Sequence, residues 1–236
     1  MSSSQPLSAK TALGRLPVLK SPRILGNWVL WLEQRPHEKG RTTAMIRPWL
    51  QTDATAKELT AAPANLRCRI HEYGGGAMAV ALMGDNLLLT WIDDGDGCLW
   101  QQTWRGLGSE DCAALTAKQP IRISAPGSWA LGGGLIDQTR LRWLGVMECN
   151  GRDQLVSVAL NQSDQHPKVL HAADDFVGYP ALSADGSQLA WVEWRQPAMP
   201  WDASELRCAC LSPEGQLMQV PVSYTHLTLP TRSTGG

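Results

Sequence analysis

The chain has 236 residues, of which 18% are charged and 43% are hydrophobic, and its formal net charge at pH 7 is −1. This length and hydrophobic fraction suffice for one large β domain, or two small ones, with a sizeable core. The near-zero net charge and the absence of long Lys/Arg runs exclude nucleic acid and anionic membranes as favoured partners.

Six cysteines are scattered along the chain, at positions 68, 98, 112, 149, 208 and 210. They form no C-x-x-C motif, and no His lies at the spacing of a zinc site, so we expect neither a structural metal nor a cofactor. The sequence does not begin with a secretion signal and contains no apolar run as long as a membrane span. Together these features predict reduced thiols and a cytoplasmic location, in which the sequon Asn161-Gln162-Ser163 is a coincidence.

Residues 1–18 are polar and without periodicity, and we expect them to form an extended N-terminal arm. From residue 19 to residue 220 the chain repeats with a period of about 50 residues, the length of one four-stranded propeller blade. Each repeat holds two successive apolar strands. The predicted first strands are Trp28–Leu32, Asn86–Ile92, Leu141–Met147 and Gln188–Trp194, and the second strands are Thr42–Trp49, Cys98–Trp104, Gln154–Leu160 and Glu205–Leu211.

These segments favour strands over helices. Leu87 to Ile92, for example, is short, apolar and bounded by turn residues, which is typical of a strand buried on both faces. No segment sustains a helical apolar stripe over three turns, and the nearest approaches, Ala54–Ala62 and Ser109–Ala117, are expected to be polar connectors. The sequence therefore predicts an all-β fold, a partial β-propeller of about four blades with four antiparallel strands each.

Three segments carry a family resemblance. In Tyr179–Leu206 a Ser-x-Asp-Gly turn feeds an apolar strand, and a Pro-rich loop then interrupts the blade. Arg69–Ala77 reads RIHEYGGGA, followed by Met78 where an aromatic residue is usual, and Trp28–Arg35 reads WVLWLEQR. In this order and spacing they resemble the N-terminal propeller of prolyl oligopeptidase-family serine peptidases, of the acylaminoacyl-peptidase or dipeptidyl-aminopeptidase-like branch.

The resemblance implies that residues 19–220 form the first part of a propeller of about seven blades. It also implies an α/β-hydrolase domain that this chain lacks. The implied parent enzyme hydrolyses short peptides, releasing aminoacyl, acylaminoacyl or dipeptidyl units from the amino terminus. The implied partners are therefore short peptide substrates and the missing C-terminal domain. Since each blade is covered by its neighbours, an incomplete ring leaves apolar surface exposed, which predicts poor solubility for this chain alone.

Residues 221–236 differ in character from the rest. Val222–Thr231 resembles the translation of a transposase sequencing adapter, so we expect this tail to be foreign to the fold and assign no catalytic role to His226. The alternative is an ordinary strand, because polar and apolar residues alternate along part of the segment.

No G-x-S-x-G nucleophile elbow occurs in the sequence, so we expect no catalytic residue in this chain and no activity without the hydrolase domain. Two glycine triplets, Gly74–Gly76 and Gly132–Gly134, lack the Gly-Lys-Ser/Thr of a P-loop and predict close backbone approach. Asp93–Gly97 suggests a calcium loop, but position 12 of an EF-hand would fall on Trp104, so we expect a polar hairpin.

The candidate substrate-binding residues come from two of the family motifs. They are Arg69, His71, Glu72 and Tyr73 from the first, and Trp201 and Asp202 from the Pro-rich loop. In a structural interpretation Glu72 pairs with a cation, while His71 and Tyr73 form hydrogen bonds between blades. In a functional interpretation one or two of the set face the cavity shared with the hydrolase domain, where Glu72 binds the amino terminus of a substrate.

Two other functions remain open. A stand-alone propeller that serves as a protein-binding scaffold is the main alternative, because propellers host many functions. A propeller enzyme with its own site would need a central carboxylate cluster, for which Glu33, Glu72, Glu148 and Glu193 are the candidates because they occupy similar predicted strand ends. Solvent-facing strand ends are the simpler interpretation of these four residues.

Overall fold

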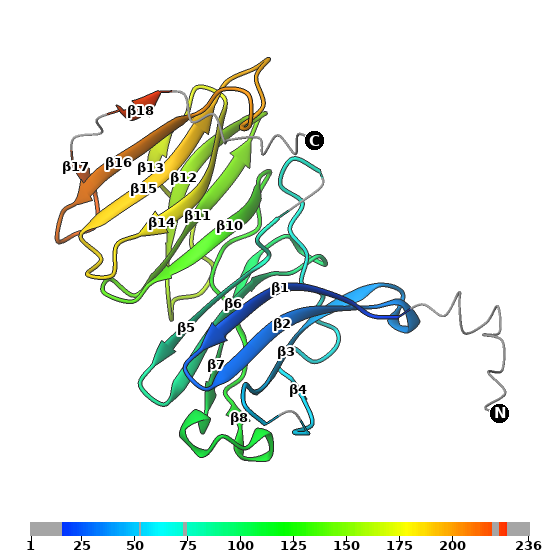
Figure 1. Ribbon diagram of the computed structural model, residues 1–236. Helices are drawn as coiled ribbons and strands as arrows, with labels where there is room; N and C mark the ends of the chain where they lie inside the picture. Colours follow the sequence, from blue (N-terminus) through cyan, green and yellow to red (C-terminus); the bar gives the residue numbers. More distant parts are fainter. Residues whose placement is uncertain (1–15, 52, 73–74, 219–221, 226–236) are drawn as a thin grey trace, which may run out of the picture.

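The computed structural model describes residues 16–51, 53–72, 75–218 and 222–225. They form four antiparallel sheets that follow one another in chain order, and we call them blades 1 to 4 (Figure 1). Blade 1 contains β1 (Val18–Leu25), β2 (Trp28–Arg35), β3 (Arg41–Pro48) and β4 (Lys57–Glu58); blade 2 contains β5 (Met78–Met83), β6 (Asn86–Ile92), β7 (Leu99–Arg105), β8 (Thr116–Ala117) and β9 (Ile121–Arg122). Blade 3 contains β10 (Ala130–Asp137), β11 (Arg142–Cys149), β12 (Arg152–Ala159) and β13 (Lys168–Ala172); blade 4 contains β14 (Phe176–Leu182), β15 (Gln188–Trp194), β16 (Glu205–Leu211), β17 (Leu217–Met218) and β18 (Val222–Thr225).

The all-β class is confirmed, and each blade has four successive strands paired in chain order, to which β9 in blade 2 and β18 in blade 4 are added by pairing with β7 and β16. The described ranges contain no α-helix, and three single turns of 3-10 helix are present: η1 (Pro36–Glu38), η2 (Leu107–Ser109) and η3 (Cys112–Ala114). Accordingly, none of the described helices is long and apolar enough to cross a membrane. The two segments whose sequences came nearest to a helical pattern are connectors. Ala54–Ala62 contains β4, and Ser109–Ala117 contains η3 and β8.

The two middle strands of each blade agree with the sequence prediction. β6, β15 and β16 have the predicted bounds, and the other middle strands differ by up to three residues. Apolar side chains fill the space between neighbouring blades, and the indoles of Trp143 and Trp191 are fully enclosed there. Burial of this kind on both faces is what the continuous apolar runs predict.

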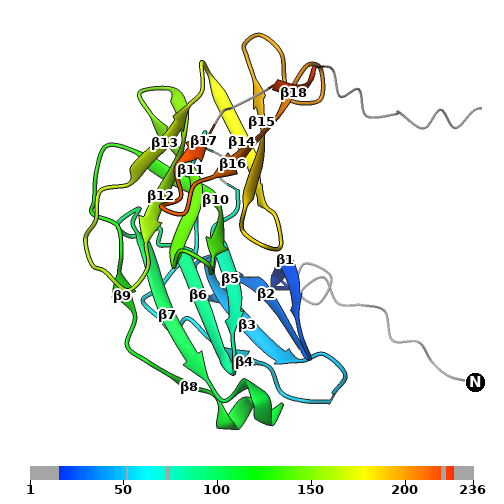
Figure 2. The ribbon, with the colours of Figure 1, turned by 90° about the vertical axis from the view of Figure 1, so that its left-hand side faces the viewer.

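The four blades follow one another along an arc, and the first strand of each blade lies on its inner side (Figure 1). Both ribbon views show β5, β10 and β14 as neighbours (Figures 1 and 2). The outermost strands, such as β4 and β17, have only two residues. β1 leaves apolar side chains exposed, with 65% of Leu19 and 59% of Ile24 accessible. Blade 1 thus presents uncovered apolar surface, as expected of a blade without a neighbour on one side.

Two predicted end segments fall largely outside the described residues. The arm is described only from residue 16, and of the tail only residues 222–225 are described. These four residues form β18, which pairs with β16 at Glu205, Leu206 and Arg207, while β17 pairs with the same strand at Cys210 and Leu211. The adapter origin of the tail stays a prediction.

Candidate functional site

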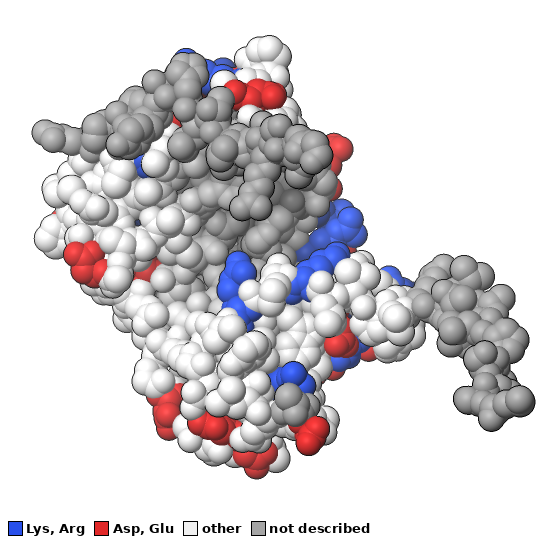
Figure 3. All heavy atoms as spheres, viewed as in Figure 1, with Lys and Arg blue, Asp and Glu red and all other residues white. Residues whose placement is uncertain are grey.

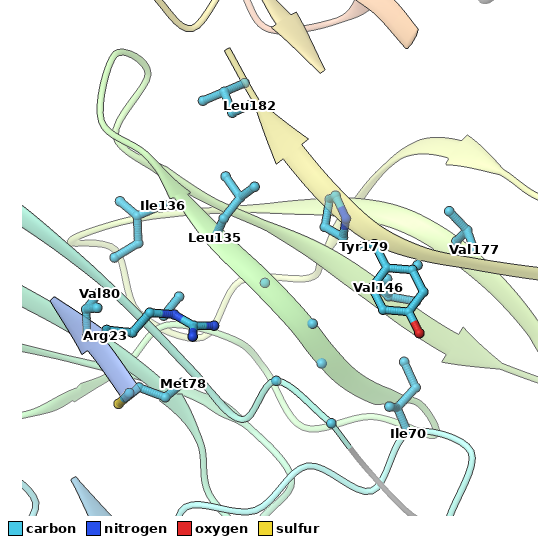
Figure 4. A pocket seen from close by; sticks show the side chains of 18 of the residues that line it. Arg23, Ile70, Met78, Val80, Leu135, Ile136, Val146, Val177, Tyr179 and Leu182 are labelled. Atoms are coloured by element: carbon cyan, nitrogen blue, oxygen red, sulfur yellow. The ribbon is translucent and has the colours of Figure 1, made fainter. Parts of the chain in front are cut away.

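A cavity of about 1280 Å³ runs along the inside of the arc (Figure 4). Its wall consists mainly of the first strands of all four blades and the loops and turns at their ends, and Val146 of β11 and Trp194 of β15 also line it. Among the labelled side chains, Arg23 comes from β1, Met78 and Val80 from β5, Leu135 and Ile136 from β10, and Val177, Tyr179 and Leu182 from β14. The wall is therefore assembled from segments distant in sequence.

The cavity has two chemically different ends. One end is built from the turns that join the first and second strands of blades 3 and 4, including Gln138, Thr139 and Gly186. The other end includes His71, which precedes β5, and Trp201 in the loop between β15 and β16. Because adjacent strands are antiparallel, these two sets lie at opposite ends of the inner strands.

The wall is mainly apolar and carries little charge. Arg23 is the one Lys or Arg among the described residues that line the cavity, and no Asp or Glu is among them. In the space-filling view, several Lys and Arg side chains lie near the middle, while Asp and Glu lie mostly toward the edges (Figure 3). This composition suits an uncharged or anionic ligand better than a cation.

The inner strands of blades 1, 3 and 4 share a bulge that the sequence analysis missed. Their pairing with the second strand shifts between Lys20 and Arg23, between Gly132 and Leu135, and between Gly178 and Ala181. At each bulge two residues of the inner strand oppose one residue of the second strand. These pairs are Ser21-Pro22, Gly133-Gly134 and Tyr179-Pro180, whose first members have φ of 51°, 61° and 56°. Pro inside a strand-like segment was the available signal, because Pro is confined to edges and bulges of sheets.

The two glycine triplets meet at this wall, and the prediction of close backbone approach is confirmed. Gly133 donates its backbone N–H to the carbonyl of Gly76 at 3.1 Å. A Cβ on Gly76 would lie 2.6 Å from the Cα of Gly133. Blades 2 and 3 can therefore approach this closely only because Gly76 lacks a side chain.

His71 connects three blades beside the cavity. Its Nε2 lies 2.9 Å from Oδ1 of Asp153 in β12, and its backbone N–H donates to the Glu148 carboxylate at 2.5 Å. Oδ2 of Asp153 accepts a hydrogen bond from the backbone N–H of Val177 in β14 at 3.0 Å. Burial raises the pKa of the Asp153 carboxyl, against the opposing effect of its Val177 and His71 contacts. The His71–Asp153 contact is thus a fixed junction between blades 2, 3 and 4.

A second junction joins blades 3 and 4. His171 Nε2 in β13 lies 2.6 Å from Oε1 of Glu193 in β15, and the indole N–H of Trp191 donates to the same oxygen at 2.7 Å. Burial acts to raise the pKa of the Glu193 carboxyl, but the contacts with His171, Trp191 and Arg207 outweigh it and the pKa is lowered. The ionised form of Glu193 is therefore favoured in the fold.

The structure separates the predicted site residues. His71 and Trp201 line the cavity, whereas Arg69, Glu72 and Asp202 do not. Arg69 pairs with Asp94 at 2.7 Å, and Asp202 accepts a hydrogen bond from the backbone of Met199 at 3.1 Å. Tyr73 lies outside the described residues.

Glu72 does not behave as the structural interpretation predicted. It is exposed in the turn before β5, and within the described residues it has no ion-pair partner. His71 does form the hydrogen bond between blades that this interpretation gave it.

The proposed carboxylate cluster is not assembled. Glu33, Glu148 and Glu193 occupy second strands, but Glu72 lies in a turn and none of the four lines the cavity. Within the part of the chain that the structure describes, no three His, Cys, Asp or Glu side chains group as metal ligands would.

Asp93–Gly97 forms the predicted polar hairpin between β6 and β7. Its carboxylates accept hydrogen bonds from protein donors, among them the backbone N–H groups of Gly95 and Cys98, each at 2.9 Å. These Asx-type contacts occupy the oxygens that a calcium loop would direct to the ion.

The fold and part of the sequence are shared with known peptidases. The chain is 25% identical to a puromycin-hydrolyzing peptidase of Mycobacterium tuberculosis, with a TM-score of 0.78 over 95% of this chain and 33% of that chain. It is 23% identical to a puromycin hydrolase, with a TM-score of 0.76 over 94% of this chain and 35% of the other. TolB from Acinetobacter baumannii, 15% identical with a TM-score of 0.54, shares the fold.

The chain thus spans about a third of the length of the peptidases it matches. No family model matches the chain, and no curated protein sequence matches it. The similarity extends along almost the whole chain. The resemblance to prolyl oligopeptidase-family peptidases is therefore confirmed: the chain is similar to puromycin-hydrolyzing peptidases over about a third of their length, as a propeller portion would be.

Proposed function

We propose that this chain is the substrate-gating part of a serine peptidase that hydrolyses short peptides from their amino terminus. In this proposal the inner wall of the propeller admits and orients the peptide, and a hydrolase domain outside this chain supplies the nucleophile. The observation that carries the proposal is the cavity of about 1280 Å³ along the first strands of all four blades.

The shape and rigidity of the wall support a gating role. The cavity is wide enough for a few residues of extended peptide, since pockets of about 300–1,000 Å³ hold small-molecule ligands. The contacts of His71 with Asp153 and Gly76 with Gly133 hold neighbouring blades together. A wall held in this way restricts entry by size, because a folded protein cannot pass between packed blades.

The apolar wall changes what we expect of substrate binding. Glu72 lies outside the lining, so this part of the wall offers no carboxylate to a free amino terminus. Orientation would instead come from apolar contacts and from backbone groups that the bulges leave unpaired at the inner edge.

The test uses the longer protein that continues this chain into its hydrolase domain. Peptides of three to about thirty residues that share one scissile bond are compared by kcat/KM. We expect a fall of at least about tenfold from the shortest to the longest peptide, because only short chains fit the cavity. Equal values across the series would reject gating.

A control separates gating from catalysis. A fluorophosphonate probe should label the longer protein and leave the 236-residue chain unlabelled, because the chain has no G-x-S-x-G elbow. Labelling of the chain itself would show a nucleophile in the propeller and overturn the division of roles.

We also propose that the protein acts in the cytoplasm. All six cysteines are free thiols in the structure, although oxidising compartments favour disulfides. Subcellular fractionation of the source cells tests the location, and recovery of the protein from the cell exterior would contradict it.

A further inference from the structure

Aromatic rings gather at one end of the cavity. Phe176 stacks on Trp194, with ring centroids 5.5 Å apart and planes inclined by 18°. Tyr179 lies 6.5 Å from the Trp194 ring, and the His71 ring meets Phe176 edge-on at 5.4 Å. All four side chains line the cavity. We call Phe176, Tyr179, Trp194 and Trp201 the aromatic end.

Tyr179 is held in the cavity at a conformational cost. It is the first residue of the β14 bulge, with φ of 56°, and it precedes Pro180. Positive φ is unfavourable for a bulky residue, and a following Pro restricts the backbone further. At the corresponding bulge of β10 the residue is Gly133, with φ of 61°.

This strain yields little packing in return. The Tyr179 side chain is 71% exposed, although glycine would fit the same bulge without strain. Strained residues that persist without a packing reason cluster at ligand-binding positions. The ring therefore points to a ligand contact.

The loop between β15 and β16 supplies the facing side chains. Trp201 is 63% exposed and Met199 is 39% exposed, and both line the cavity. The loop is held within itself by the N–H of Asp202, which donates to the Met199 carbonyl at 2.9 Å, and to the residue just before β14 by the N–H of Gln196, which donates to Asp175 at 3.0 Å. The exposed rings are thus placed before any ligand arrives.

We propose that the aromatic end binds an aromatic side chain of a short peptide and disfavours basic side chains. The choice of a peptide as ligand rests on the proposed function. Offset and edge-on contacts between rings favour an aromatic group over an aliphatic one of similar size. A Lys or Arg side chain would lose hydration at a wall whose described lining has no carboxylate to compensate it.

The test measures binding to the 236-residue chain by titration calorimetry, with no hydrolysis required. The probes are acetyl-Ala-X-Ala-amide peptides in which X is Phe, Leu or Lys, so that the blocked ends carry no charge. We expect Phe to bind about two- to tenfold more tightly than Leu, and Lys to bind more weakly than both. Equal affinities for the three peptides would overturn the proposal.

Two variants locate the site. Tyr179→Asn removes the ring while keeping a residue that tolerates positive φ, and should weaken Phe-peptide binding by about two- to tenfold. Tyr179→Phe keeps the ring and should bind like the parent chain. Trp49→Ala is the matched control, because Trp49 is 48% exposed but lies outside the cavity lining.

Each outcome decides the proposal. Weaker Phe-peptide binding in Tyr179→Asn alone supports the aromatic end. Equal weakening in Trp49→Ala rejects it. Unchanged affinity in a Tyr179→Asn variant with unchanged thermal unfolding also rejects it. If Tyr179→Asn does not fold, saturation-transfer NMR on the Phe peptide bound to the parent chain tests the proposal instead. The Phe ring protons should then receive more saturation than the Ala methyl groups. Uniform saturation of the peptide would reject the proposal. The result is independent of gating, because selective binding can hold even if kcat/KM does not vary with peptide length.

Discussion

His71 Nε2 lies 2.9 Å from Oδ1 of Asp153, a carboxylate with no solvent exposure. The histidine belongs to the turn before blade 2 and the aspartate to β12 of blade 3. The second aspartate oxygen accepts the N–H of Val177 in blade 4. A motif that the family resemblance marked for substrate binding therefore also holds three blades together.

His71→Ala should lower the free energy of unfolding by about 2–4 kcal/mol, because it leaves the buried Asp153 carboxylate with one partner fewer. Urea denaturation of the two chains measures the difference. His71→Gln has the same positive φ and keeps an N–H donor, so it should lose less. Equal losses in both variants would show that the backbone, and not the contact with Asp153, is responsible.

Gly76→Ala should be more damaging than Gly84→Ala. Both glycines have positive φ, 58° and 61°, so the conformational penalty is shared. A Cβ on Gly76 would meet Gly133 at 2.6 Å, whereas nothing lies within 4 Å of a Cβ on Gly84. The steric term should add about 1–3 kcal/mol to the loss in Gly76→Ala. Indistinguishable midpoints in urea would contradict the close packing of blades 2 and 3.

Glu193 should contribute to stability above about pH 4.3, the ordinary pKa of a glutamate. Because its pKa is lowered in the fold, the unfolded chain takes up the proton first as the pH falls. The contribution is therefore present above the unfolded pKa and is lost as the pH falls toward the lower folded value.

Between about pH 5 and pH 3, the free energy of unfolding should consequently fall less in Glu193→Gln than in the parent chain. Urea denaturation at a series of pH values gives both curves. Glu72→Gln serves as the control, since Glu72 is exposed and lies in a turn. Parallel curves for Glu193→Gln and the parent chain would exclude Glu193 as a source of the acid dependence.

The thiols should differ in reactivity with iodoacetamide in the native chain. Cys210 is exposed, whereas Cys68 is 4% accessible and burial raises the pKa of its thiol. The thiolate is the reacting form, so Cys68 should react much more slowly. Peptide mass spectrometry over time measures each site, and Cys210→Ser should remove the fast phase. Rapid labelling of Cys68 would show that blades 2 and 3 separate in solution.

The apolar middle strands could be predicted from sequence because they are buried on both faces. Leu87 to Ile92 is such a run, and β6 has the predicted bounds. The inner strands could not, because VLKSPRIL in β1 and FVGYPAL in β14 contain the Pro and Gly that normally indicate turns. In these strands the same residues form the bulges.

The candidate site was only partly predictable for a related reason. His71 and Trp201 belong to family motifs and do line the cavity, but Tyr179 was singled out only as the start of a motif. Its position on the wall depends on β5, β10 and β14 lying side by side, and the spacing of residues along the chain does not encode that arrangement. The absence of Glu72 from the lining has the same origin, because neighbouring residues in a turn point in different directions.

Photo-crosslinking of a substrate in the longer protein tests the role of the inner wall most directly. The probe is a short peptide that carries benzoylphenylalanine beside its scissile bond, and mass spectrometry maps the attachment sites. If the wall receives the substrate, crosslinks should fall on peptides that contain β10 or β14, above all near Tyr179, and an excess of unlabelled peptide should suppress them. Competed crosslinks confined to residues outside the four blades would contradict a substrate role for this propeller.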